Sequence, residues 1–99
     1  MKPGVRFRSE AAQDVVEAFS WYESQRLGLG AQFEAAVDHA VSLLQRLPQA
    51  GPVVHRQVRR ILLRRFPYAV YYLLNPDLID VLAVMHMHRD PSRWRRRAR

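Results

Sequence analysis

Cysteine is absent from the 99-residue chain, and lysine occurs once, at Lys2. The lack of cysteine excludes disulfide-stabilised scaffolds, thiolate nucleophiles and cysteine-ligated zinc. No apolar run approaches the roughly 18 residues of a membrane span, and the first residues carry no apolar signal segment. We therefore expect a soluble cytoplasmic protein. Residues 1–99 should form a single domain, because a chain of this length has room for one hydrophobic core.

Acidic residues are scarce in the second half of the chain. The whole chain has sixteen Lys and Arg against nine Asp and Glu, a formal net charge of +7. Residues 1–52 contain five bases and six acids, whereas residues 53–99 contain eleven bases and three acids, a net charge of +8. Fifteen of the bases are arginines, whose guanidinium groups suit phosphates and carboxylates. We expect this charge to form one face or groove that attracts nucleic acid or an acidic protein segment.

The first half of the chain predicts a strand followed by two helices. Apolar and basic residues alternate from Val5 to Arg8, as in a half-buried strand. Ser9 is a favourable N-cap, and apolar residues then recur three or four positions apart to about Arg26. A second amphipathic helix, with Leu47 on its apolar side, ends at Pro48. The short connection makes the two helices an antiparallel hairpin.

The second half predicts three strands. Residues 55–65 mix arginines with aliphatic residues, residues 68–74 are rich in strand-forming residues, and residues 78–86 are nearly all apolar. The last pattern is typical of a central strand buried on both faces. Short turns make consecutive strands antiparallel. The predicted order is β-α-α-β-β-β, an α+β fold in which the helical hairpin packs on a small, mostly antiparallel sheet. A basic tail begins at about residue 92 and is either mobile or a short helix.

The order of elements and two segments resemble the RelE/ParE superfamily, the toxins of bacterial type II toxin–antitoxin modules. The segments are Phe66–Tyr72 (FPYAVYY) and Val84–Pro91 (VMHMHRDP), and the resemblance covers essentially the whole chain. Membership implies a small growth-inhibiting protein. It also implies a cognate antitoxin, whose acidic C-terminal segment wraps around the toxin and silences it, and it leaves open a homodimer within that complex.

The superfamily contains two kinds of toxin. RelE-like members cleave messenger RNA on the ribosome, whereas ParE-like members inhibit DNA gyrase and have no known hydrolytic site. Many relatives place an arginine, which steadies phosphate in the nucleases, directly after the position of Tyr68, where this chain has Ala69. The strand end at His86 and the following Arg89 look more like ParE. We expect a ParE-like gyrase inhibitor; the alternatives are a RelE-like ribosome-dependent endonuclease and a non-toxic member that still binds antitoxin.

A nuclease would need a base, an acid and cations around the phosphate. His86 and His88 lie two positions apart, on one side of an extended segment, and histidine titrates near neutral pH. With Arg60 and Arg89 they would form a metal-independent catalytic group. The interpretation we favour is that both histidines pack or form hydrogen bonds at a strand end. We expect no metal and no cofactor, because His86, His88 and Asp90 have no evident fourth ligand nearby.

Partner binding is assigned to the cationic second half. Its arginines bind phosphates or antitoxin carboxylates, or else they are solvated side chains whose stems cover apolar surface. Trp94 either anchors the tail against the hairpin or sheet or, if exposed, contacts a partner. The candidate partner-binding residues are Arg56, Arg59, Arg60, Arg64, Arg65, Arg89 and Trp94.

Overall fold

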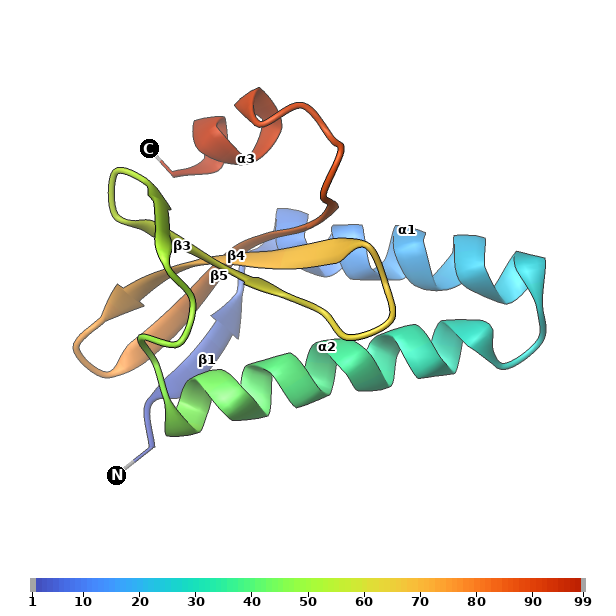
Figure 1. Ribbon diagram of the computed structural model, residues 1–99, viewed down its shortest axis with the longest axis horizontal. Helices are drawn as coiled ribbons and strands as arrows, with labels where there is room; N and C mark the ends of the chain where they lie inside the picture. The colour runs from blue at the N-terminus through green and yellow to red at the C-terminus, as the bar shows by residue number, and fades with distance from the viewer. Residues whose placement is uncertain (1, 99) are drawn as a thin grey trace.

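The computed structural model describes residues 2–98, which form five strands and three helices (Figure 1). In chain order they are β1 (Gly4–Phe7), α1 (Ser9–Gln25), α2 (Leu29–Arg46), β2 (Val53–His55), β3 (Val58–Leu62), β4 (Tyr68–Asn75), β5 (Leu78–His86) and α3 (Ser92–Arg97). The strands make one sheet in the order β1-β5-β4-β3-β2, with β1 parallel to β5 and the other neighbours antiparallel. The predicted α+β fold is confirmed.

One face of the sheet carries the helical hairpin. Phe33 and Val37 of α2 pack with Val70 and Tyr72 of β4 in the larger apolar core. The hairpin turns at Gly28, whose φ of 89° favours glycine. The start of α1 differs from our expectation: Ser9 is its first residue, and no side chain caps the helix.

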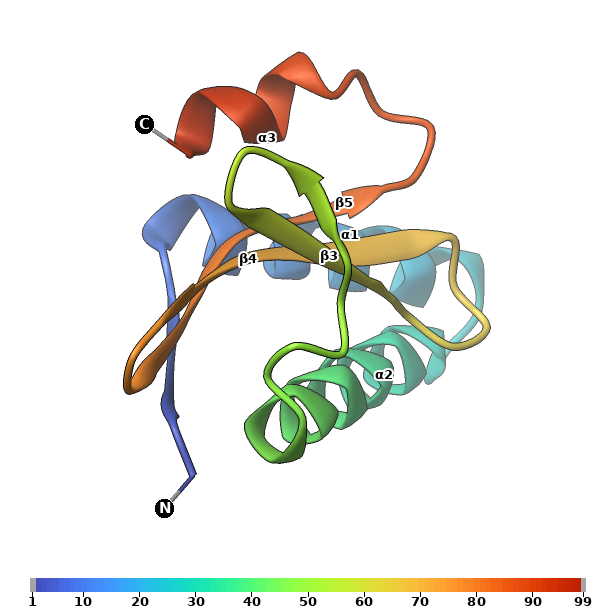
Figure 2. The same ribbon diagram turned by 60° about the vertical axis from the view of Figure 1, so that its left-hand side comes forward.

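The opposite face of the sheet is covered in part by α3, which is the structure of most of the basic tail. Figure 2 shows α3 on one side of the sheet and α2 on the other. Trp94 of α3 packs with Ala69, Tyr71 and Met85 in a second, smaller core. Since both faces are covered here, β5 is buried on both sides, as its sequence predicts. Within residues 2–98, no helix combines the length and apolar character needed to cross a bilayer.

The region predicted as one strand over residues 55–65 is divided in the structure. β2 and β3 form a short hairpin because the chain reverses at Arg56, which has a φ of 54°. β3 ends at Leu62, and a second positive φ, 70°, occurs at Arg65 before β4 begins. Glycine or asparagine usually occupies such positions and marks a hairpin in the sequence. Arginine rarely adopts this conformation, so the sequence gives no signal for either turn.

Candidate partner-binding surface

A cleft of about 690 Å³ lies between α1 and the adjoining ends of β4 and β5. We call it the α1–β5 cleft. The helix contributes Asp14, Glu17, Ala18 and Trp21, whose spacing of three, four and seven positions places them on one helical face. The strands and the chain after β5 contribute the other wall, which includes Tyr68, His86, His88, Arg89 and Arg93.

Aromatic rings line the inner part of this cleft. The ring of Tyr68 lies 5.4 Å from that of His86 and 5.9 Å from that of Tyr22, and Trp21 meets Tyr22 edge-on at 5.0 Å. Burial raises the pKa of both tyrosines; Tyr68 adds to the effect at Tyr22, and at Tyr68 the charge of Arg89 opposes it. Both hydroxyls are therefore protonated at neutral pH. Trp21 is 57% exposed at the rim, where an aromatic side chain favours protein contact.

The two histidines interact through a turn rather than along a strand. β5 ends at His86, and His88 lies in the turn that follows, with the two ring centroids 5.3 Å apart. The backbone N–H of His88 donates to Nδ1 of His86 at 3.1 Å. Because Nδ1 accepts this bond, the proton of the neutral His86 ring is on Nε2. His86 therefore has a local structural role at the end of β5.

The candidate nuclease residues do not form one group. His86 is paired in register with Tyr68, which packs on the helical side of the sheet. Arg60 is paired with Tyr71, which belongs to the core beneath α3. Directly opposed residues of antiparallel strands point to the same side. His86, His88 and Arg89 thus line the α1–β5 cleft, whereas Arg60 lies on the other face of the sheet.

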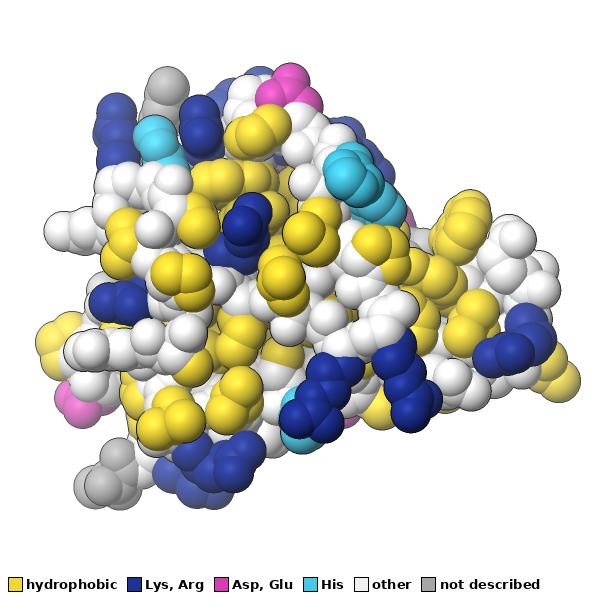
Figure 3. Space-filling view, in the orientation of Figure 1, with side chains coloured by type: hydrophobic (Ala, Val, Ile, Leu, Met, Phe, Trp, Pro, Cys, Tyr) yellow, Lys and Arg dark blue, Asp and Glu magenta, His cyan; other side chains and the backbone are white. Residues whose placement is uncertain are grey.

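The remaining arginines of the candidate set are also dispersed. Arg59 donates from Nη1 to the carbonyl oxygen of Gly51 at 2.8 Å, so it holds the loop before β2. Arg64 and Arg65 are exposed between β3 and β4, and Arg56 is exposed at the β2–β3 turn. In Figure 3 the basic side chains occupy separate places with hydrophobic side chains between them. On the side of the molecule seen in Figure 3, the basic side chains of the described residues therefore do not form the single continuous face that the composition predicts.

Trp94 lies inside the protein. It is 4% exposed and anchors α3 on the sheet, the first of its two predicted roles. Arg97 reinforces this anchor by donating to the Asp14 carboxylate at 2.6 Å and to the Leu82 carbonyl oxygen at 3.1 Å. Beneath α3, Ala69 is fully buried. Ala69 and Trp94 thus belong to one buried cluster on this face of the sheet.

Metal binding finds no support in the geometry of the cleft. In residues 2–98 no three His, Asp or Glu side chains are arranged to hold a metal ion. Asp90 instead accepts a hydrogen bond from the backbone N–H of Ser92 at 2.9 Å. This contact organises the start of α3.

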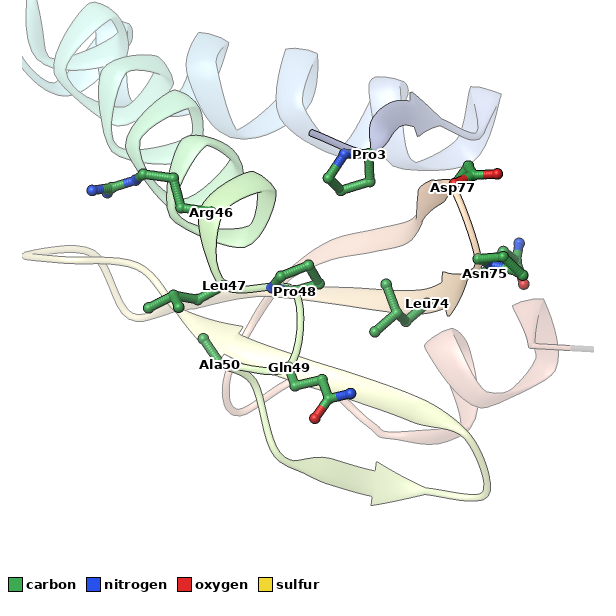
Figure 4. A pocket seen from close by; sticks show the side chains of 10 residues that line it. Pro3, Arg46, Leu47, Pro48, Gln49, Ala50, Leu74, Asn75 and Asp77 are labelled. Carbon is green, nitrogen blue, oxygen red and sulfur yellow. The ribbon is translucent and has the colours of Figure 1, made fainter. Parts of the chain in front are cut away.

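A second hollow, of about 870 Å³, lies at the other end of the sheet, between the end of α2 and the β4–β5 turn (Figure 4). Pro3, Pro48 and Leu74 supply much of its apolar lining. Leu47, expected on the apolar side of α2, is exposed at its edge. This hollow suits an apolar side chain of a partner, and its lining contains no histidine or paired carboxylates for catalysis.

Several solved structures share this fold, among them two from toxin–antitoxin systems. The chromosomal ParDE toxin–antitoxin system of P. aeruginosa matches with a TM-score of 0.64 and 19% identity, over 86% of this chain and 96% of that chain. The toxin–antitoxin complex RelBE2 of Mycobacterium tuberculosis matches with a TM-score of 0.64 and 22% identity, over 87% and 99%. At this level of identity the likeness concerns the fold.

Sequence comparison identifies the family. Toxin ParE2 of Mycobacterium tuberculosis, in strains CDC 1551 and H37Rv, is 29% identical over 89 residues, which are 89% of this chain and 85% of the relative. The family model described as the ParE toxin of the type II toxin–antitoxin system parDE matches residues 5–91. The protein is therefore a type II toxin of the RelE/ParE superfamily, as its strand segments indicate. Within that superfamily it belongs to the ParE toxin family.

Proposed function

We propose that this toxin inhibits DNA gyrase through protein–protein contact, without catalysis of its own, and that a cognate antitoxin neutralises it. The observation that carries the proposal is the burial of Ala69. In nuclease relatives this position steadies a phosphate, but here it has no exposed surface and lies under α3. Alanine has no group that can bind a phosphate, and the position lies in one buried cluster with Trp94.

The separation of the candidate nuclease residues supports the same proposal. Cleavage of RNA requires a base, an acid and cations within hydrogen-bond reach of one phosphate, which is about 3 Å. His86 and Arg60 lie on opposite faces of the sheet. In addition, Nδ1 of His86 already accepts a hydrogen bond from the backbone of His88.

For the antitoxin we propose an acidic segment that contacts the exposed arginines. Both structural relatives are toxin–antitoxin assemblies, and the second half of this chain has a net charge of +8. Of the seven candidate residues, Arg59 and Trp94 serve the fold, and Arg60 is half-buried. The proposed carboxylate contacts are therefore Arg56, Arg64, Arg65 and Arg89. Trp21, at the rim of the α1–β5 cleft, adds an apolar contact in the same cleft that Arg89 lines.

The test combines two assays on the same induced culture and on purified protein. If the proposal is right, the toxin blocks supercoiling of relaxed plasmid by purified gyrase, and primer extension finds cellular mRNA uncut. The antitoxin, taken from the adjacent reading frame, should reverse the block. Codon-phased mRNA cuts with normal gyrase activity would overturn the proposal in favour of the endonuclease. Antitoxin binding without growth arrest would instead identify a non-toxic member.

A further inference from the structure

Beyond the α1–β5 cleft, a second cationic surface joins the β2–β3 turn to α3. Arg56 and His55 from the turn, and Arg95 and Arg96 from α3, line one hollow of about 400 Å³. We call this surface the α3 patch. The four residues come from segments about forty positions apart in the chain, so only the folded protein brings them together.

The α3 patch is built on a rigid base. Trp94 lies beneath it, with the guanidinium carbon of Arg95 5.4 Å above the indole ring and the His55 ring 5.9 Å from it. A guanidinium group at this distance is held by a cation–π interaction. The indole in turn stacks on Tyr71, and Arg97 ties the helix to Asp14. The positive groups are thus presented in a defined arrangement.

The charge of the patch is only partly offset within the described residues, and its arginines form no ion pair. In residues 2–98 the ion pairs use Arg6, Arg8 and Arg97, and none uses Arg56, Arg95 or Arg96. Asp90, the acid that lines the hollow, accepts a hydrogen bond from the backbone of Ser92. This bond lowers the pKa of Asp90, and the charges of Arg96 and Arg95 lower it further, so one carboxylate faces three arginines and the patch stays cationic. The local potential is positive: burial lowers the pKa of His55, and the charges of Arg95 and Arg56 lower it further.

We propose that the α3 patch binds the phosphate backbone of duplex DNA. The planar guanidinium group of arginine can donate two hydrogen bonds to one phosphate. Three unpaired guanidinium groups that neutralise DNA phosphates also release the counterions bound to those phosphates. Proteins that bind single strands stack exposed aromatic rings on the bases. Here Trp94 and Tyr71 are both buried, so the patch can contact a backbone but cannot stack on bases. A duplex, whose bases are already stacked, is the nucleic acid that matches this surface.

An acidic peptide is the competing partner, and it fits this surface less well. Peptide segments usually combine their charges with an apolar anchor in a pocket. None of the exposed large hydrophobic side chains of residues 2–98 lines this hollow; they are Val16, Trp21, Leu27, Leu47, Val53, Leu62 and Met87. The DNA contact shares Arg56 with the proposed antitoxin contacts, whereas Arg95 and Arg96 belong to the α3 patch alone. It requires neither gyrase nor the antitoxin, so DNA binding and gyrase inhibition can be measured separately.

The experiment measures fluorescence anisotropy of a short labelled DNA duplex of arbitrary sequence against the purified full chain. The variant Arg56→Gln/Arg95→Gln/Arg96→Gln should bind roughly tenfold more weakly at low salt. The slope of log affinity against log salt should fall by about 2–3 units, the number of phosphate contacts removed. The control Lys2→Gln/Arg26→Gln/Arg46→Gln loses the same charge elsewhere and should bind almost as the original chain does. The triple Arg→Lys variant of the patch should retain most of the salt slope.

The outcomes separate the possible partners. Equal losses in the patch variant and the charge-matched control would overturn the proposal, because net charge alone would then explain binding. Tighter binding of a single-stranded RNA or of polyglutamate than of the duplex would also overturn it. Circular dichroism and thermal unfolding of each variant confirm that the fold is intact before affinities are compared. If all variants are folded, the proposal is supported when only the patch variant loses affinity and the lost affinity is for the DNA duplex.

Discussion

Trp94 of α3 stacks on Tyr71 of β4, with ring centroids 4.5 Å apart and planes inclined by 19°. This contact joins the last helix to the middle of the sheet. It covers the part of the sheet that holds Ala69, which belongs to the same buried cluster. It also supplies the base on which Arg95 and His55 are presented. One aromatic pair thus both buries this part of the sheet and supports the cationic side chains of the α3 patch.

Replacing Trp94 with alanine tests the structural part of this contact. The indole is almost completely buried, so Trp94→Ala should lower the free energy of unfolding by about 3–5 kcal/mol. Urea unfolding followed by far-UV circular dichroism measures this loss. Trp94→Phe, which keeps an aromatic ring over Tyr71, should lose clearly less of the free energy of unfolding than Trp94→Ala does. If the alanine variant unfolds at the same urea concentration as the original chain, α3 does not depend on this residue.

The helices and most strands could be predicted because their patterns are local. The buried face of α2 repeats Phe33, Val37, Ala40 and Leu44, and all four are in the core. The β2–β3 turn and α3 could not be predicted in the same way. At the turn, Arg56 adopts a backbone conformation that its residue type does not indicate. The tail folds because Trp94 finds Tyr71, a contact set by the tertiary fold rather than by helix propensity.

The candidate site was harder to predict than the fold. Composition reveals how many arginines the second half contains, but the strand register decides where they point. Adjacent residues Arg59 and Arg60 fall on opposite faces, and Arg59 binds the Gly51 carbonyl. The cleft wall on α1 is not among the sequence-based predictions, although Asp14 and Trp21 lie on one helical face. This wall can be recognised only in the folded protein, because the sequence does not show that the exposed Trp21 of α1 lines the same cleft as the end of β5.

The buried carboxylate of Asp80 predicts a pH dependence of stability. Asp80 is 2% exposed and accepts hydrogen bonds at 2.9 Å from both Arg6 and Arg8. Burial alone would raise its pKa, but the hydrogen bonds and charges of Arg8 and Arg6 hold the pKa below its ordinary value. The stabilisation is therefore complete above the pKa of an unfolded aspartate, about 3.9, and is lost as the pH falls below it.

Asp80→Asn should remove this contribution. At pH 7 we expect a loss of about 2 kcal/mol in the free energy of unfolding, since Asn cannot accept charged hydrogen bonds equally well. Below about pH 4 the gap between the variant and the original chain should narrow. Urea unfolding at a series of pH values measures both effects. Asp77→Asn, at the exposed β4–β5 turn, is the control and should change the free energy of unfolding little. If the difference in stability between Asp80→Asn and the original chain is the same at acid pH as at pH 7, the assigned role of Asp80 is wrong.

The close approach of α1 and α2 predicts a cost for a single methyl group. A Cβ at Gly30 would lie 2.7 Å from the carbonyl oxygen of Phe19, so Gly30→Ala should push the helices apart. Overpacking of this kind costs about 1–3 kcal/mol. Ala31→Ser at the next, exposed position is a contrasting control with a smaller effect, because its side chain points into solvent. Thermal unfolding compares the two, and a Gly30→Ala chain as stable as the original would show that the helices can separate freely.

His88 distinguishes the proposed function from catalysis. Its side chain is exposed, and its contribution to the β5 end is a backbone N–H, which alanine also provides. His88→Ala should therefore retain growth inhibition and gyrase inhibition on induction. Retention of antitoxin binding and of the circular dichroism spectrum serves as the control for folding. Loss of toxicity in a folded, antitoxin-binding His88→Ala chain would favour the endonuclease.

Trp21 provides a test of the α1–β5 cleft as a partner surface. Because the indole is already 57% exposed, Trp21→Ala should change the free energy of unfolding by only about 1 kcal/mol. Exposed tryptophans at interface centres contribute about 2 kcal/mol or more, so affinity for the antitoxin should fall at least roughly thirtyfold. Val16→Ala is a matched control: Val16 is equally exposed on α1 but does not line the cleft. Isothermal titration calorimetry measures all three chains, and equal affinities for Trp21→Ala and Val16→Ala would exclude the cleft from the interface.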